Sequence, residues 1–251
     1  MKSVLIVILF SFFMPCLFGF HPDSLVKTGN NLYAKGDFYH AIDVYEQIVD
    51  SGYEASELYF NLGNAYYKVN NIARAILNYE RAKKLNPRDE DIKHNLTIAN
   101  AHVVDKIDII PEFFLKTWIT GFTNITSSDT WAIISILSFI LFLLLFLIYL
   151  FSGRIGIKKL SFWLGVLMFL ISISSFYSSF KRKRFLTLMD SAIIITPTVT
   201  AKSSPAETGV DLFVIHEGSR VKVVDSIDVW NEIKLSDGKR GWVRKTDLTK
   251  I

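Results

Sequence analysis

The chain has 251 residues, half of them hydrophobic, and a formal net charge of +4 at pH 7. Its single cysteine, Cys16, excludes an internal disulfide and a cysteine-rich zinc site. The positive excess equals one tetrad, Lys181-Arg182-Lys183-Arg184. Because no aromatic pattern accompanies the tetrad, we expect these four side chains to contact lipid phosphates at a membrane edge rather than nucleic acid.

The N-terminus has the pattern of a secretory signal peptide at residues 1–20. Lys2 is followed by a nearly unbroken apolar stretch over residues 4–13, and polar sequence begins at His21. Two alternatives stay open. The segment could remain as an uncleaved anchor, or Cys16 could carry a lipid.

An internal repeat with a period of 34 residues organises residues 22–104. Equivalent residues recur in the pairs Gly29/Gly63, Asn30/Asn64, Tyr33/Tyr67, Ala41/Ala75 and Tyr45/Tyr79. The period and the residue types resemble the tetratricopeptide repeat (TPR), in which each unit is a pair of helices. This resemblance implies an all-α TPR solenoid with repeats at 22–55 and 56–89. Apolar residues three or four apart predict one further, capping helix at 89–105.

Two short polar segments are predicted to form the turns inside the repeats. Gly36-Asp37 and Asn70-Asn71 combine residue types that tolerate a left-handed backbone or bond their own main chain. Each segment is therefore expected to separate the first helix of its repeat from the second.

The tetratricopeptide resemblance also implies a protein-binding groove, lined by the first helix of each repeat. By repeat position, the groove residues would be Asn30, Tyr33, Phe60, Asn64, Tyr67 and Lys68. Asparagine amides can hydrogen-bond an extended peptide backbone. Asp91 and Asn95 stand where members that bind a terminal carboxylate carry basic residues, which argues against that specificity. For Tyr33 and Tyr67, packing between neighbouring repeats is an equal alternative.

Residues 105–130 form a linker rich in aromatic residues, among them Phe114, Trp118 and Phe122. Aromatic side chains next to a membrane span favour a segment at the headgroup level. A linker packed against the repeats is the alternative. Ser127 and its polar neighbours suit the N-terminus of the helix that follows.

Two runs without a charged residue, at 131–151 and 160–180, predict a two-helix transmembrane hairpin. Each is about the ~20 residues that a helix needs to cross a membrane. Because the link between them is short, the flanking segments lie on the same side. Neither run holds an ionisable residue, which argues against a transporter or pump.

Small residues recur on one face of the second run, at Gly165, Ser172, Ser175 and Ser179. Such a face allows close helix contact. Its partner could be the first run or a helix of another protein.

Short β-type runs between turns predict a small all-β barrel at 190–251. Asp237-Gly238 is a hairpin signal, and with Trp230 and the closing Gly241-Trp242-Val243 it makes the segment resemble the bacterial SH3 domain. That resemblance implies binding of a peptide or of cell-wall material, without catalysis. Trp230 and Trp242 could line the groove of such a domain or belong to its core.

The predicted signal peptide places the repeats and the SH3-like barrel outside the bacterial inner membrane, in the periplasm. Arg154, Lys158 and Lys159 in the hairpin link agree with this orientation by the positive-inside rule. The tetrad at 181–184 disagrees with it, so the opposite orientation stays open.

The order of signal peptide, tetratricopeptide repeats, membrane hairpin and bacterial SH3 domain resembles the BatE-like family of the Bat aerotolerance operon. The resemblance implies a non-catalytic, membrane-anchored scaffold that works beside von Willebrand-type Bat proteins and a MoxR-type ATPase. A peptidoglycan-binding sensor or anchor is the alternative. The sequence contains no phosphate loop, glycine-rich fingerprint or nucleophile elbow. We therefore expect no enzyme activity, cofactor or metal.

Overall fold

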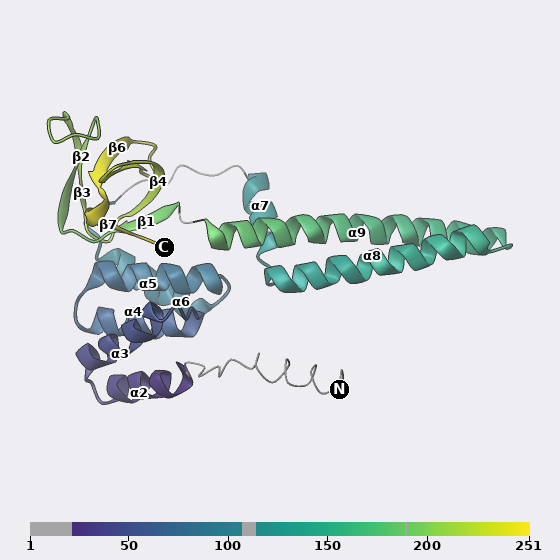
Figure 1. Ribbon diagram of the computed structural model, residues 1–251, viewed down its shortest axis with the longest axis horizontal. Coiled ribbons are helices and arrows are strands. Elements are labelled where there is room, and N and C mark those ends of the chain that lie inside the picture. The colour runs from purple at the N-terminus through teal and green to yellow at the C-terminus, as the bar shows by residue number, and fades with distance from the viewer. Residues whose placement is uncertain (1–21, 107–113, 189) are drawn as a thin grey trace, which may run out of the picture. The chain divides into compact units, whose positions relative to one another are not determined.

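The computed structural model describes residues 22–106, 114–188 and 190–251 (Figure 1). The predicted signal peptide and the lipidation alternative at Cys16 lie outside these residues. The described residues fall into two compact units, divided in the sequence between Glu54 and Ala55.

The first unit is a pair of helices, α2 (Pro22–Ala34) and α3 (Phe38–Asp50). Asp37 caps α3, and its side chain accepts a hydrogen bond from the backbone N–H of His40 at 3.4 Å. This is the side-chain-bonded turn that the sequence predicts for Asp37.

The second unit begins with three helices, α4 (Ser56–Lys68), α5 (Ile72–Leu85) and α6 (Glu90–Ala101). The turn between α4 and α5 contains Asn70 in the left-handed region, with a φ of 61°. Asn71 then caps α5 by accepting a hydrogen bond from the N–H of Arg74 at 3.2 Å. The predicted turns and the predicted helical repeat region are therefore confirmed.

Close packing of a tyrosine against a glycine explains the 34-residue period. A Cβ built on Gly63 would lie 2.7 Å from the ring of Tyr79, which is 2% exposed. In the first unit, a Cβ on Gly29 would lie 2.5 Å from the ring of Tyr45. Only glycine lets the first helix of each pair approach the second so closely.

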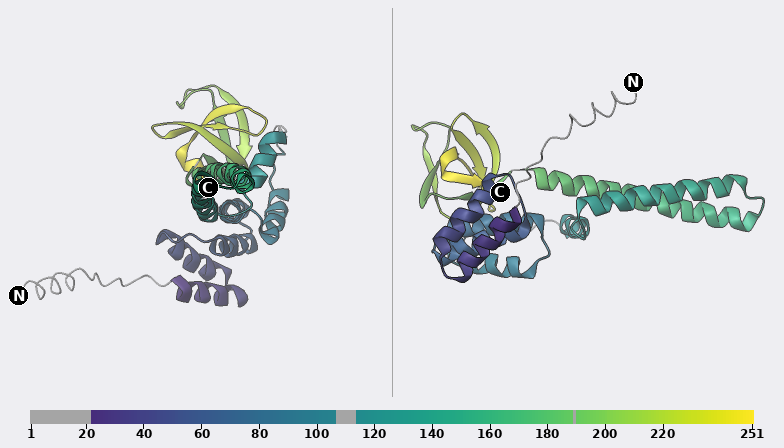
Figure 2. Two further views of the ribbon diagram at one scale, coloured as in Figure 1. Left: turned by 90° about the vertical axis from the view of Figure 1, so that its right-hand side faces the viewer. Right: turned by 60° about the horizontal axis from the view of Figure 1, so that its bottom comes forward.

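The middle of the second unit is a helical hairpin of α8 (Ser128–Phe151) and α9 (Ile155–Thr187), preceded by the short α7 (Phe114–Thr123). The two long helices lie side by side (Figure 1, Figure 2). Ser127 caps α8, and its hydroxyl accepts a hydrogen bond from the N–H of Thr130 at 3.1 Å. Both helices are long and apolar enough to cross a membrane.

Small residues of α9 face α8, so α8 is the partner of the small-residue face. The Ser135 hydroxyl donates to the carbonyl of Ser172, and the Ser172 hydroxyl donates to the carbonyl of Ser135, both at 3.0 Å. Nearer the open end, the Ser179 hydroxyl donates to the carbonyl of Ser128 at 2.8 Å. A Cβ on Gly165 would be in ordinary contact with α8. These contacts satisfy hydroxyl groups inside the apolar hairpin.

Residues 191–250 form one antiparallel sheet of seven strands in the order β3-β2-β6-β5-β4-β1-β7. The strands are β1 (Ser191–Ile194), β2 (Thr198–Lys202), β3 (Asp211–His216), β4 (Arg220–Ile227), β5 (Trp230–Lys234), β6 (Arg240–Arg244) and β7 (Leu248–Lys250). The core beneath the sheet consists of Ala192, Ile194, Val199, Ala201, Ile215, Val221, Ile233, Leu235, Val243 and Leu248. Asp237-Gly238 forms the predicted turn between β5 and β6, with a φ of 95° at Gly238.

The sheet is not the closed barrel that the sequence predicts. Strands β3 and β7 are the two ends of the strand order, and they are not paired with each other. Two further features of the described strands accompany the opening. The ladder between β2 and β6 is a single pair, Lys202↔Trp242, and β7 has only three residues. The prediction of an antiparallel all-β unit is confirmed. The prediction that its strands close into a barrel is wrong.

Replacing Gly63 with alanine is expected to destabilise the α4–α5 pair by about 1–3 kcal/mol, because the new methyl group would overlap the buried Tyr79 ring. Hydrogen exchange of the α4 and α5 amides in the purified full chain measures this loss. Gly121→Ala is the matched control, since nothing lies within 4 Å of that position. Unchanged exchange in Gly63→Ala would contradict the packing argument.

Candidate binding surfaces

The two asparagines predicted for the groove each bind a tyrosine of their own repeat. In the first unit, the Tyr45 hydroxyl donates to Oδ1 of Asn30 at 2.6 Å. In the second unit, the Tyr79 hydroxyl donates to Oδ1 of Asn64 at 2.8 Å, and Nδ2 of Asn95 donates to the same oxygen at 2.8 Å. These carbonyl oxygens therefore hold the helices together, which the prediction of a peptide contact did not foresee.

The aromatic groove residues are partly exposed and contact neighbours in their own units. Tyr33 lies edge-on to Phe38, with ring centroids 5.2 Å apart. The Tyr67 hydroxyl lies 3.2 Å from Nε2 of His102, just beyond α6. Tyr67 thus combines intramolecular packing with a surface that remains open to solvent.

The other two groove candidates lie at different depths on α4. Phe60 is partly buried and lies 6.0 Å, between ring centroids, from Tyr79. Lys68, at the end of α4, is exposed. Lys68 is therefore the predicted groove residue of this helix that is most accessible to a partner.

One carboxylate joins the end of the helical repeats to the sheet. Oδ2 of Asp105 accepts hydrogen bonds from the backbone N–H of His216 and from the hydroxyl of Ser219, both at 2.7 Å. Its Oδ1 lies 2.8 Å from Nδ1 of the His216 ring. Partial burial by itself raises the pKa of Asp105, but the hydrogen bonds from His216 and Ser219 outweigh it and lower the pKa below its usual value.

The Asp105 cluster contains an aspartate, a histidine and a serine, but it is not a nucleophilic triad. In a triad the serine donates to the histidine and the histidine donates to the aspartate. Here both Ser219 and His216 bond directly to Asp105. The cluster therefore positions the β3–β4 turn and gives no activated serine.

Apolar packing and an ion pair reinforce the same junction. Gly218, with a φ of +83°, approaches so closely that a Cβ there would lie 2.9 Å from Val103 and 3.2 Å from Ile76. Beside it, the Arg220 guanidinium lies 3.3 Å from the carboxylate of Glu80, whose side chain is only 10% exposed. Side chains of α5 thus contact the sheet along the β3–β4 turn.

The prediction that all four tetrad residues contact lipid is wrong for Arg182. This side chain is 5% exposed, and its guanidinium donates to the carbonyls of Lys84 and Leu85 and to Oδ1 of Asn124. The last carbonyls of an α-helix have no partner inside the helix, so a cation at the end of α5 is well placed. Lys183 and Arg184 are exposed, and Lys181 is partly exposed.

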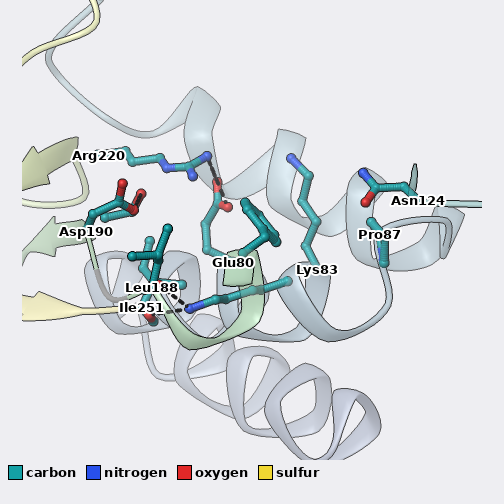
Figure 3. Close-up of a pocket in the computed structure, with 11 residues that line it drawn as sticks. Glu80, Lys83, Pro87, Asn124, Leu188, Asp190, Arg220 and Ile251 are labelled. Atoms are coloured by element: carbon teal, nitrogen blue, oxygen red, sulfur yellow. Dashed lines mark hydrogen bonds and ion pairs between the residues drawn. The ribbon is translucent and has the colours of Figure 1, made fainter. Parts of the chain in front are cut away.

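A cavity of about 150 Å³ lies where α5, the end of α9 and the sheet come together (Figure 3). Its lining residues are Glu80, Lys83, Lys84, Pro87, Asn124, Phe185, Leu188, Asp190, Ser191, Arg220 and Ile251. In Figure 3, Lys83 stands beside the Glu80–Arg220 pair. The Lys84 amine donates to the carbonyls of Leu188 and Ile251. The cavity therefore combines charged groups with apolar ones.

The two tryptophans predicted for an SH3-type groove differ in exposure. Trp230 is 7% exposed, which favours its core alternative, and the Arg244 guanidinium lies 6.0 Å from its ring centroid. Trp242 is partly exposed and pairs with Glu232 across the β5–β6 ladder. Trp242 is thus the more accessible of the two.

Sequence patterns gave no sign of the Asp105 cluster or of the cavity, because both join residues far apart in the chain. Asp105 and Ser219 are separated by 114 positions. A single aspartate after a predicted helix, such as Asp105, does not indicate which distant residues it will contact. The only available signal was the small and polar His216-Glu217-Gly218-Ser219 turn, which marks a close approach of the backbone.

Comparison with known families gives one match. The family model of the tetratricopeptide repeat matches residues 56–89, the span predicted for the second repeat. No curated protein matches the chain. The matched module typically binds other proteins and is non-catalytic, so the helical repeats point to protein–protein interaction. Among the described residues, no group of three or more His, Cys, Asp or Glu side chains could hold a metal ion.

Asp105→Asn is expected to loosen the β3–β4 turn from the repeats. The cluster loses its negative charge and one carboxylate oxygen, and Oδ2 accepts from both the His216 N–H and the Ser219 hydroxyl. Loss of such a buried hydrogen bond corresponds to about 1–3 kcal/mol. Hydrogen exchange at His216–Ser219 in the full chain should accelerate. Asp211→Asn is the matched control, because the Asp211 side chain is 68% exposed and pairs with Lys202 at 2.8 Å, away from the Asp105 cluster.

The unmodified protein should lose the same contact in acid. The pKa of Asp105 is lowered by folding, so its stabilisation is present above the unfolded pKa of about 4 and disappears as pH falls through the folded value. Exchange at His216–Ser219, corrected for the intrinsic pH dependence, should therefore rise only below about pH 4. A rise confined to pH 6–7 would assign the transition to a histidine instead.

Proposed function

We propose that this protein is a non-catalytic scaffold, anchored in a membrane by α8 and α9, that binds other proteins through its tetratricopeptide repeats. The observation that carries the proposal is the family match at residues 56–89 in a chain that also contains two membrane-length apolar helices. The repeat supplies the binding surface, and the hairpin holds that surface beside a membrane.

The exposure of the hairpin supports a membrane environment. Large apolar side chains point outward along both helices, among them Leu137, Phe151, Trp163 and Phe176 at 61–83% exposed. In water such a surface would be strongly unfavourable, while in lipid it is not. Both helices satisfy their backbone groups internally, as the hydrocarbon core requires.

The second unit separates two binding surfaces. The sheet contacts α5 and the end of the repeats through Glu80 and Asp105. The proposed groove residues Phe60, Tyr67 and Lys68 lie on α4 and keep exposed area. One partner could therefore bind the α4 surface while another binds the sheet. In the first unit, taken by itself, Asn30 and Tyr33 are proposed as protein-binding residues.

The finer identity is also a proposal. The module order resembles the BatE-like family, which suggests work beside von Willebrand-type Bat proteins and a MoxR-type ATPase in the cell envelope. The antiparallel sheet would act as an SH3-like module, with Trp242 on its binding surface. Lys181, Lys183 and Arg184 would contact lipid phosphates.

A double variant of the groove tests the scaffold. Tyr67→Ala with Lys68→Ala in the detergent-purified full chain should reduce binding of the operon's von Willebrand-type proteins at least about tenfold, the scale of an interface anchor residue. Lys93→Ala is the control, because Lys93 is a lysine of α6 that pairs with Glu90. Binding that survives the double variant would move the contact away from α4.

Topology mapping tests the orientation. We expect a periplasm-active reporter to be active both after Asp105 and after Ile251, because a hairpin returns the chain to one side. Activity at neither position would indicate the opposite orientation. That orientation is the one that the positive-inside rule predicts from the tetrad at 181–184. Activity at only one position would exclude the hairpin.

Sedimentation with purified cell wall separates the scaffold from the peptidoglycan-binding alternative. The detergent-solubilised full chain should stay in the supernatant if the sheet binds proteins. Co-sedimentation that Trp242→Ala abolishes would favour the wall-binding alternative.

A further inference from the structure

We propose that the cavity between α5, α9 and the sheet binds the phosphate-bearing headgroup of a membrane phospholipid, with Lys83 as the phosphate contact. The inference rests on the membrane-anchored part of the proposed function. It assigns a specific lipid site, distinct from the general attraction of exposed basic residues to a bilayer.

Among the described residues that line the cavity, one cationic side chain has no hydrogen-bond or ion-pair partner. Three cationic and two anionic side chains line it: Lys83, Lys84, Arg220, Glu80 and Asp190. Arg220 pairs with Glu80 at 3.3 Å, and Asp190 pairs at 3.0 Å with Lys222, which lies outside the lining. Lys84 donates to the carbonyls of Leu188 and Ile251 at 2.9 and 3.1 Å.

Lys83 differs from these neighbours. Within the described parts of the chain, Lys83 forms no hydrogen bond or ion pair through its side chain, and the residue is partly buried at the edge of the cavity. Figure 3 shows it standing between the Glu80–Arg220 pair and Asn124. An anion could therefore bind Lys83 without breaking an existing ion pair, and a partly desolvated ammonium gains more from a phosphate than an exposed one does.

The size of the cavity selects a small group. The cavity has a volume of about 150 Å³. Drug-sized ligands usually need at least about 300 Å³. A phosphate group is small enough for this volume, whereas a whole drug-sized ligand is not.

The position along α9 favours a lipid as the source of that phosphate. The charge-free run ends at Phe180, and Phe185 lies five residues further, or about 7.5 Å along the helix. The headgroup layer on each side of the hydrocarbon core is about 5–8 Å thick. Phe185, which lines the cavity, would thus lie where lipid glycerol and phosphate groups are found.

The apolar part of the lining fits the same assignment. Pro87, Phe185 and Leu188 offer no charged group to a soluble phosphate, but they can contact the glycerol and the first carbons of an acyl chain. Asn124, which precedes α8 and accepts a hydrogen bond from Arg182, adds a polar amide to the lining. A ligand with both a phosphate and an apolar tail uses both kinds of lining residue.

Native mass spectrometry of the detergent-purified full chain, titrated with a short-chain phosphatidylglycerol, tests the proposal. We expect binding to saturate at one lipid molecule per chain. Lys83→Ala should weaken this binding about tenfold, which is the effect of losing one charge-assisted hydrogen bond. Lys93→Ala removes a lysine from α6 and should leave binding unchanged. Phe185→Ala should weaken binding of the lipid as well.

Two further experiments complete the test. Competition with a soluble phosphate separates a lipid ligand from a soluble one, and membrane fractionation separates the lipid-site proposal from the anchoring proposal. Glycerol phosphate at the same concentration should not compete; full competition with no effect of Phe185→Ala would assign a soluble phosphate ligand and overturn the lipid proposal. Equal lipid binding by Lys83→Ala and the unmodified chain would also overturn it. Membrane fractionation is read separately: a chain that fails to fractionate with membranes contradicts the anchoring itself, whereas a membrane-bound chain without lipid selectivity contradicts only the cavity site.

Discussion

The arrangement of the second unit depends on the partial burial of a single carboxylate, Asp105. An aspartate in this position is stable only if donors surround it, and the β3–β4 turn supplies three through His216 and Ser219. That requirement brings the turn onto the end of the repeats, where Gly218 can approach Val103 because it has no side chain. The Glu80–Arg220 pair forms beside the same contact. Helical repeat and sheet are thereby joined by polar groups that neither could satisfy alone.

Arg182 links the hairpin to the repeats by the same physical rule. The last carbonyls of α5 need donors, and the guanidinium at the end of α9 reaches two of them. A charge next to a membrane span is usually assigned to lipid, and three of the four tetrad residues keep that proposed role. Arg182 instead binds within the protein, because its planar guanidinium has five donors and can reach the C-terminus of α5 and the Asn124 amide together.

These contacts give the proposed scaffold a physical basis. The repeats have few helices for a solenoid, and α5 has additional contacts with the sheet through Ile76 and Glu80. The cavity between α5, α9 and the sheet lies near the end of α9, so under the proposed anchoring its occupancy would be linked to the membrane. A lipid bound there would contact all three elements, and binding energy spent on it would stabilise their mutual arrangement.

Local and periodic features were determined by the sequence alone. The 34-residue period, the Asn71 cap, the Ser127 cap and the Asp237-Gly238 turn all depend on residues close in the chain, so each was predicted from its own neighbourhood. The two apolar helices followed from run length, and their small-residue face from spacing. The tertiary structure alone decided that Asn64 bonds Tyr79, that Arg182 leaves the lipid surface and that the sheet stays open. It also decided the Asp105 cluster and the cavity at Lys83. The physical reason is that a hydrogen-bond donor or acceptor has no preferred distant partner until folding brings one within about 3 Å, and sequence spacing carries no record of that choice.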